Sequence, residues 1–257
     1  LKILSLGRIP CLSEDREAHH PFVMAGGITT FLNLEPLAPF FDFFLLGEAE
    51  ATLDNFLAAF REIRPHSVAR QEALKALAGT VTSLYVPSLY RIHYSKDGTI
   101  QSREPLEPSV PEKIKVLRPK LAEMPVRTSS LLTPDSEFAD RVLMELGRGC
   151  TRSCRFCAAG YVYRPPRVHE KSSLLGAVSE VLEREPSLGL LSACVSDIPG
   201  IEEITGLILR RGGRFSVSSL RADSLTQSLV EHLRDAGQKT VAIAPEAGSE
   251  RLRKVVN

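Results

Sequence analysis

Three cysteines lie within eight residues of one another, at Cys150, Cys154 and Cys157. The stretch that holds them, GRGCTRSCRFCAAG, has glycine on both flanks, with two arginines and a phenylalanine between the thiols. A 4Fe-4S cluster has four irons that cysteine thiolates bind, so three thiols from one loop leave one iron open to a small molecule. The spacing therefore favours an iron-sulfur cluster with one free coordination position.

A zinc site is the main alternative for the same thiols. His169 follows Cys157 by twelve residues and could complete a closed Cys3His structural site. Structural zinc sites usually show two pairs of ligands, however, and no second ligand stands beside His169. A disulfide within the cluster is disfavoured in a reducing compartment. Iron-sulfur is the favoured interpretation, and zinc stays open.

The composition limits the class of protein. The 257 residues are 43% hydrophobic and 25% charged with a net charge of +1, which is typical of a globular chain and gives no indication of a nucleic-acid partner. The chain shows neither a run of eighteen apolar residues nor a signal-peptide pattern, so we expect no membrane partner and a cytoplasmic location. Because it begins at Leu1 rather than Met, we treat it as a fragment.

Alternating strands and helices are predicted around the cysteines. Residues 141–146 are a short apolar run that predicts a buried strand ending just before the thiols. The predicted helices cover 172–185, 201–213 and 224–237, the last with a Ser224/Gln227 capping box, and the further strands cover 188–195, 214–218 and 239–244. A fourth helix begins near the end of the chain. This alternation predicts a parallel sheet, either open or part of a barrel.

The preceding region has a less regular pattern. Residues 21–27 and 41–48 predict strands that end in glycine, followed by a helix whose apolar stripe includes Leu53, Phe56 and Phe60. Residues 80–100 predict a hairpin around the Asp97-Gly98 turn, and 105–134 a proline-rich linker.

Polar side chains follow the predicted strands of the cysteine region at the points where chemistry collects in a parallel α/β barrel. Ser196 and Asp197 follow the second strand, Ser219 and Arg221 the third, and Glu246 the fourth. Each could instead serve as a surface ion pair, a helix cap or part of an ordinary turn.

The pattern C-x3-C-x2-C, with Phe156 before the last cysteine and directly after a first strand, resembles the signature of radical S-adenosylmethionine (radical SAM) enzymes. The resemblance implies that Cys150, Cys154 and Cys157 hold a 4Fe-4S cluster whose open iron chelates SAM. It also implies reductive cleavage of SAM to a 5'-deoxyadenosyl radical, with a reductant such as flavodoxin or ferredoxin. The substrate is unknown, and no catalytic residue is assigned.

Two later stretches, SSLRADSL and APEAGSERL, resemble the R-x-D and E-x-G-S segments of a radical SAM subgroup with a cobalamin-binding-type N-terminal domain. This resemblance implies that Arg221 contacts the carboxylate or ribose of SAM and Glu246 the ribose hydroxyls or the amino group. Ser196, Asp197 and Ser219 are further candidates at the strand ends.

The N-terminal residues resemble the second half of that cobalamin-binding-type domain, with glycines at the strand ends. No histidine of the chain stands in the Asp-x-His-x-x-Gly frame that ligates cobalt in classical cobalamin domains. Cobalamin therefore stays open as a further cofactor.

The predicted fold class is α/β: a partial TIM-type barrel preceded by a partial flavodoxin-like or cobalamin-binding-like segment. The predicted segments are 1–66, cobalamin-binding-like; 67–137, hairpin and linker; and 138–257, the first four βα units of a radical SAM core. The predicted function is that of a radical SAM enzyme. The alternative is an electron-transfer or sensory iron-sulfur protein that does not cleave SAM.

Overall fold

A computed structural model describes residues 1–64, 67–136 and 138–256, and the chain divides into two compact units, Leu1–Pro119 and Lys120–Asn257. The predicted segments 1–66, 67–137 and 138–257 stay predictions. Their last residues, 66, 137 and 257, lie outside the described residues. In the part of the chain that the structure describes, no helix has both the length and the apolar character needed to cross a bilayer.

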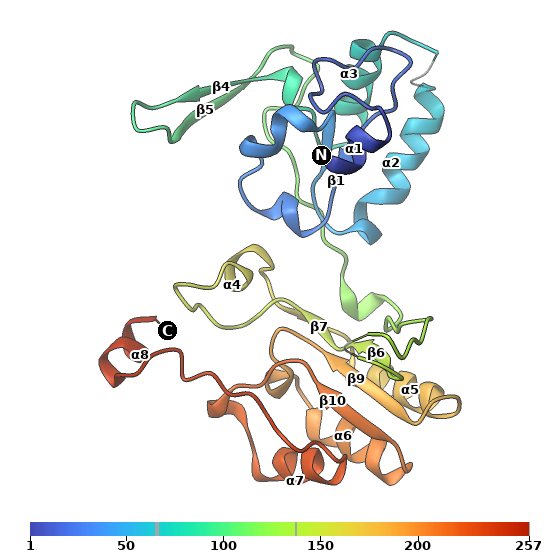
Figure 1. The fold of residues 1–257 in the computed structure, drawn as a ribbon, viewed down its shortest axis with the longest axis vertical. Helices are drawn as coiled ribbons and strands as arrows, with labels where there is room; N and C mark the ends of the chain where they lie inside the picture. The colour runs from blue at the N-terminus through green and yellow to red at the C-terminus, as the bar shows by residue number, and fades with distance from the viewer. Residues whose placement is uncertain (65–66, 137, 257) are drawn as a thin grey trace. The chain divides into compact units, whose positions relative to one another are not determined.

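The first unit is built on a small mixed sheet of order β1-β2-β3 (Figure 1). Strand β1 (Met24–Ala25) pairs in parallel with β2 (Phe43–Leu45), which confirms strands at both predicted places, and β3 (Leu84–Tyr85) pairs antiparallel with β2. The flavodoxin-like assignment of this segment is not confirmed. The helices are α1 (Lys2–Leu6), α2 (Ala49–Ile63) and α3 (Arg70–Thr80), with 3-10 turns at Ile28–Phe31, Glu35–Phe40 and Pro87–Leu89.

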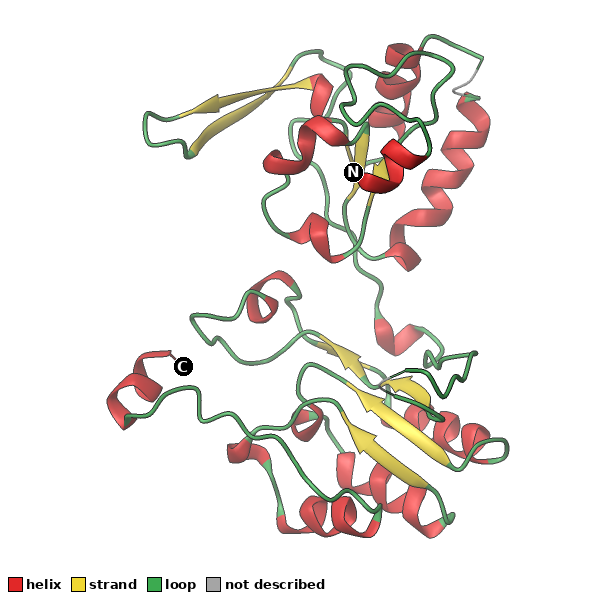
Figure 2. Cartoon of the chain, in the orientation of Figure 1, coloured by secondary structure: helices red, strands yellow, loops and turns green. Residues whose placement is uncertain are grey.

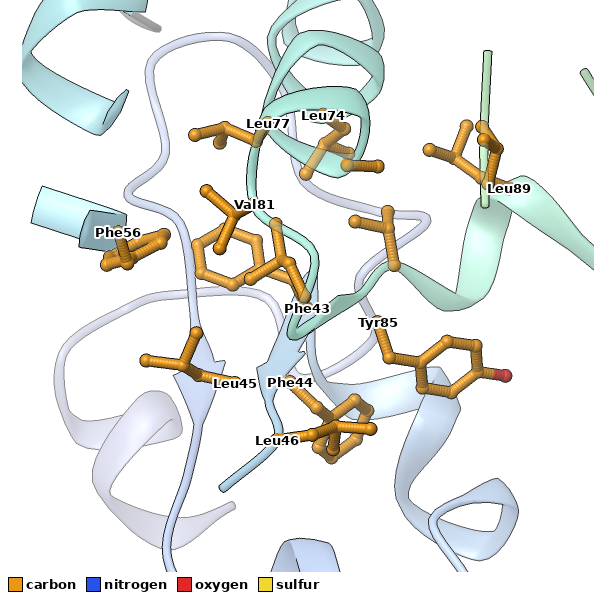
Figure 3. Packing of buried hydrophobic residues seen from close by; sticks show 14 of the residues in the cluster. Phe43, Phe44, Leu45, Leu46, Phe56, Leu74, Leu77, Val81, Tyr85 and Leu89 are labelled. Atoms are coloured by element: carbon orange, nitrogen blue, oxygen red, sulfur yellow. The ribbon is translucent and has the colours of Figure 1, made fainter. Parts of the chain in front are cut away.

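Aromatic and aliphatic side chains from β2, α2 and α3 form the core of this unit (Figure 3). Phe43 of β2 packs against Phe56 of α2, with ring centroids 5.4 Å apart, and Phe44 stacks on Tyr85 at 6.0 Å. The predicted apolar stripe of α2 therefore faces the sheet, since burying this face stabilises an amphipathic helix more than its intrinsic propensity does.

A buried ionic network ties the N-terminal segment to this core. Asp42, directly before β2, accepts from Arg16 Nη1 at 2.9 Å and from Arg70 Nη2 at 2.8 Å. The backbone N–H of Val23 also donates to Asp42 at 2.7 Å, and the remaining donors of Arg16 are bound by the carbonyls of Pro10, Cys11 and Phe40. Both charges of the Arg16–Asp42 pair are thus fully compensated in the interior, as buried ions require.

The predicted hairpin is present in the same unit. Strands β4 (Tyr90–Tyr94) and β5 (Ile100–Pro105) pair antiparallel, and a turn through Gly98 at φ 82° joins them. The residues that follow contain little regular structure apart from the 3-10 turn Leu121–Glu123, in agreement with the predicted linker.

The second unit contains a three-stranded parallel sheet of order β10-β9-β6 (Figure 2). The strands β6 (Val142–Glu145), β9 (Ser187–Leu191) and β10 (Arg214–Val217) lie at the first three predicted strand positions. They alternate with the helices α5 (Lys171–Leu182), α6 (Ile201–Arg210) and α7 (Gln227–Asp235), whose apolar faces share one core with the sheet. This mixed α/β arrangement is consistent with a partial TIM-type fold.

Two expectations for this unit are wrong. Residues 239–244 form no strand in the described structure, because Val241 and Ile243 stay more than 40% exposed and gain neither a ladder partner nor a core face. The helix α7 is capped by Thr226, whose hydroxyl accepts from the Leu229 N–H at 3.2 Å, and not by Ser224. The fourth helix is present as α8 (Glu250–Val256).

Candidate functional site

The cysteine loop leaves the sheet at the carboxyl end of β6. Strand β7 (Gly147–Arg148) pairs antiparallel with β8 (Arg167–Val168), and these two short strands close the loop that holds the cysteines and the helical turn α4 (Ala159–Val162). At the neck, Gly149 has φ +84°, and a Cβ there would lie 2.6 Å from the Tyr163 carbonyl oxygen. Only glycine fits this position without moving the backbone.

The three thiols have the chemistry of cluster ligands but are not arranged as a finished metal site. Each cysteine of the described chain is a thiol rather than half of a disulfide, and Cys150, Cys154 and Cys157 are all partly exposed. Within residues 1–64, 67–136 and 138–256, no three His, Cys, Asp or Glu side chains are gathered closely enough to hold a metal ion. Three accessible thiols on one loop fit a 4Fe-4S cluster as a donor set.

A pocket of about 220 Å³ lies beside the cysteine loop. It brings together Cys154, Arg221 and Glu246, which the sequence analysis had singled out from three separate segments. Apolar side chains form much of the remaining wall: Phe156, Leu220, Ala222, Ala244, Pro245 and Val256. In Figure 1, α4, α8 and the loops after the strands lie at the same end of this sheet. The pocket can hold a small molecule with both charged and apolar parts.

Arg221 is oriented by a neighbouring carboxylate. Its Nε and Nη2 donate to the two oxygens of Asp223, both at 2.9 Å, and its Nη1 lies 4.0 Å from the Cys154 sulfur. The hydrogen bonds to Asp223 raise the pKa of Arg221 and, in return, hold the pKa of Asp223 below its ordinary value. A permanent cation thus borders both the pocket and a thiol.

Asp197 lies in an ionic contact with the cysteine loop. Arg152 Nε and Nη2 donate to its two oxygens at 3.0 Å each, and the Thr151 hydroxyl donates at 3.2 Å. The Arg152 hydrogen bonds lower the pKa of Asp197 to about 2. Asp197 is therefore a carboxylate at neutral pH, and it is not among the residues that line the pocket.

The remaining predicted contacts are placed differently. The Ser196 hydroxyl accepts from the Arg221 N–H at 3.1 Å and from the Ser224 hydroxyl at 2.8 Å, so it supports the loop that carries Arg221. Ser219 is exposed, and its carbonyl accepts from the Val195 N–H. Glu246 is exposed at the pocket rim with φ +66°, a backbone conformation that residues other than glycine rarely adopt.

His169, the candidate zinc ligand, is buried. Its Nε2 lies 4.0 Å from Glu145 Oε2, and neither ring nitrogen has a hydrogen-bond partner among the described residues. Glu145 in turn accepts from Arg148 at 2.7 and 2.9 Å. The described structure therefore does not gather His169 with the three cysteines into a metal site.

Sequence reasoning missed Asp223 and the specific role of Arg152. Asp223 stands in the R-x-D stretch, but only the arginine had been singled out there. Arg152 is one of the two arginines between the thiols, and the sequence analysis assigns no partner to it. Two features of the sequence could have identified Arg152: its place between the first two cysteines, and the acidic residues Asp197 and Asp223 that follow two successive predicted strands.

Comparisons with known proteins match two parts of the chain. Residues 1–87 match the family described as "Radical SAM proteins, N-terminal", and residues 144–257 match the "Radical SAM superfamily". The first differs from a cobalamin-binding family, so the predicted cobalamin-binding-like subgroup is not confirmed.

The chain is also 31% identical over 238 residues to "Uncharacterized protein MJ0966" of Methanocaldococcus jannaschii. The match covers 91% of this chain and 44% of that protein, so the chain spans less than half the length of this relative. No solved structure matches the chain significantly.

Proposed function

Because the chain carries an N-terminal domain and a core domain of the radical SAM superfamily, we propose that it is part of an enzyme that cleaves S-adenosylmethionine with a 4Fe-4S cluster. Cys150, Cys154 and Cys157 would hold the cluster. When bound, the cluster supplies the electron for reductive cleavage of SAM. The observation that carries the proposal is the pocket that Cys154, Arg221 and Glu246 share.

The charges of this pocket complement the methionine end of SAM. One edge of the Arg221 guanidinium binds Asp223, and the other edge is suited to a carboxylate. The carboxylate of Glu246 is suited to an ammonium group or to ribose hydroxyls. Ser196, Asp197 and Ser219 stay predictions as direct contacts.

Other parts of the proposal concern the whole protein, of which this chain need only be a part. We propose a low-potential electron donor such as flavodoxin or ferredoxin as partner and the cytoplasm as location. The substrate is not assigned. Cobalamin stays a prediction for residues 1–66, since no histidine of the chain stands in the classical cobalt-binding frame.

The test is anaerobic reconstitution of the full-length protein followed by incubation with SAM and dithionite. We expect about four irons per chain and formation of 5'-deoxyadenosine. Replacing Cys150, Cys154 or Cys157 by Ala abolishes the cluster, whereas Cys11→Ala and Cys194→Ala, the matched controls, keep it. Stoichiometric zinc with failed iron uptake would contradict the proposal. A stable cluster without 5'-deoxyadenosine would favour the electron-transfer alternative.

A further inference from the structure

Arg152, between the first two cysteines, reaches the loops that follow two other strands. Its guanidinium holds both oxygens of Asp197, which lies after β9, at 3.0 Å. Its third nitrogen, Nη1, donates to Asp223 Oδ2, which lies after β10, at 3.2 Å. One side chain of the cysteine loop therefore spans the carboxyl ends of two neighbouring strands.

These contacts form a chain of alternating charge. Asp197, Arg152, Asp223 and Arg221 follow one another as anion, cation, anion and cation, and the two outer pairs are bidentate. Bidentate arginine–carboxylate pairs fix direction as well as distance, because the planar fork of the guanidinium matches the two oxygens. The Asp197 side chain is only 13% exposed and that of Arg152 31%, so solvent screens this pair less than an open surface pair.

Several other hydrogen bonds of the cysteine loop stay within the loop, and one, from the Arg155 N–H to the Val256 carbonyl at 2.8 Å, runs to α8. The Tyr161 hydroxyl donates to the Ser153 carbonyl, and the Arg164 guanidinium donates to the Ser153 hydroxyl and to the Arg152 carbonyl. These bonds shape the loop but do not attach it to the sheet. Among the described hydrogen bonds, those of Thr151 and Arg152 join the loop to the residues after β9.

We infer that the Arg152–Asp197 pair is a latch that holds the cysteine loop on the carboxyl edge of the sheet before any cluster binds. Asp197 is in this view a positioning residue, which acts on the thiols through Arg152 rather than by touching SAM. The functional importance of the latch rests on the proposed function, but the latch itself is a property of the protein without its cluster.

Trypsin gives a direct measurement, because the exposed Arg155 lies in the same loop and cleavage of the Arg155–Phe156 bond becomes faster as the backbone around it opens more often. We compare the initial rate of this cleavage in the apo forms of wild type and Asp197→Asn, using mass spectrometry. Local opening controls such cleavage, and 1.4 kcal/mol of lost stability is tenfold in the open population. We expect a rise of about tenfold. Cleavage after Arg152 is not used as a measure, because Asp197→Asn frees the Arg152 side chain and so changes how readily trypsin binds it.

The matched control is Glu203→Gln, which removes the carboxylate charge of the Lys171–Glu203 pair, at 2.7 Å, in the same unit. Both side chains of that pair are about half exposed, so we expect unchanged cleavage. Cleavage after Arg210, the last residue of α6, is the reference site outside the cysteine loop, and it should stay constant in both variants. Arg152→Lys keeps the charge but loses the fork, and should give an intermediate rise at Arg155.

Equal cleavage at Arg155 in wild type, Asp197→Asn and Arg152→Lys would overturn the latch. A rise at Arg155 that is matched at Arg210 would also overturn it, because the effect would then be on overall stability. Iron uptake is measured separately on all variants: failure of the wild type to take up iron contradicts the proposed function, whereas the apo cleavage rates still decide the latch.

Discussion

Replacing Arg221 by Ala should weaken SAM binding while leaving the cluster intact. The Arg221 side chain is only 25% exposed, and two of its nitrogens are fixed on Asp223, so the third is held toward the pocket and Cys154. A hydrogen bond to a charged group contributes about 1.5 to 3 kcal/mol. Since each 1.4 kcal/mol is a factor of ten, the dissociation constant of SAM should rise by about 10-fold to 100-fold.

The assay is anaerobic isothermal titration of reconstituted protein with SAM, together with iron content and the visible absorbance of the cluster. Arg234→Ala is the matched control, because Arg234 is an exposed cation in the same unit, paired only at the surface with Asp235. We expect its SAM affinity to equal that of wild type. Unchanged affinity in Arg221→Ala with full iron content would refute the assignment of Arg221, even if the cysteine assignment holds. Loss of iron in Arg221→Ala would instead show that the cation supports the cluster.

Three further predictions concern the fold and the loop. Asp42→Ala leaves the buried Arg16 and the partly buried Arg70 without their carboxylate, and it should lower the free energy of unfolding in urea by about 3 to 5 kcal/mol, whereas the surface change Asp235→Ala should leave it nearly unchanged. Gly149→Ala should destabilise by at least about 1 kcal/mol because φ is positive, whereas Gly176→Ala in α5, where a Cβ meets nothing, should be neutral or stabilising in the same thermal unfolding assay. The pKa of Asp197 is lowered from 3.8 to about 2, so the stabilising effect of the ionised carboxylate is present above pH 3.8 and is lost as the pH falls through about 2. A carboxyl NMR titration of Asp197 with its midpoint at the ordinary value would contradict the pairing with Arg152.

Local patterns in the sequence located most elements of the second unit. The strand β6 is a short apolar run that stops at a glycine, and its residues Val142 and Met144 are buried although β6 lies at one edge of the sheet. The helix α5 follows from apolar residues at helical spacing, three of which, Leu174, Val178 and Val181, lie in the core. Both signals are local, so they can be read without knowing the tertiary structure.

The prediction failed where an element depends on a distant partner. Residues 239–244 have a β-type pattern, but a strand forms only when a neighbour accepts its hydrogen bonds and a face covers Val241 and Ile243. The network around Asp42 is invisible for the same reason. Its arginines stand 26 residues before and 28 residues after the carboxylate, with no periodic spacing to mark them.

The site was found only in part because its residues come from loops. Arg221 follows the predicted strand β10, whereas the strand predicted before Glu246 does not form, and both residues line one pocket with Cys154. Hydrogen-bond partners cannot be predicted in this way. Asp197 and Asp223 follow different strands, yet a single arginine of the cysteine loop binds both.

The wall of the pocket that carries Glu246 is attached to the cysteine loop. Residues 239–244 add no strand to the sheet, but the Arg155 N–H donates to the Val256 carbonyl of α8 at 2.8 Å. Val256 and Arg253 of α8 also line the pocket. Because this wall depends on the cysteine loop and that loop is joined to β9 through Arg152, an opening of the latch should disturb the thiols and the Glu246 side of the pocket together. Coupling of this kind would place the order of the three thiols and of the pocket beside them under one ionic contact.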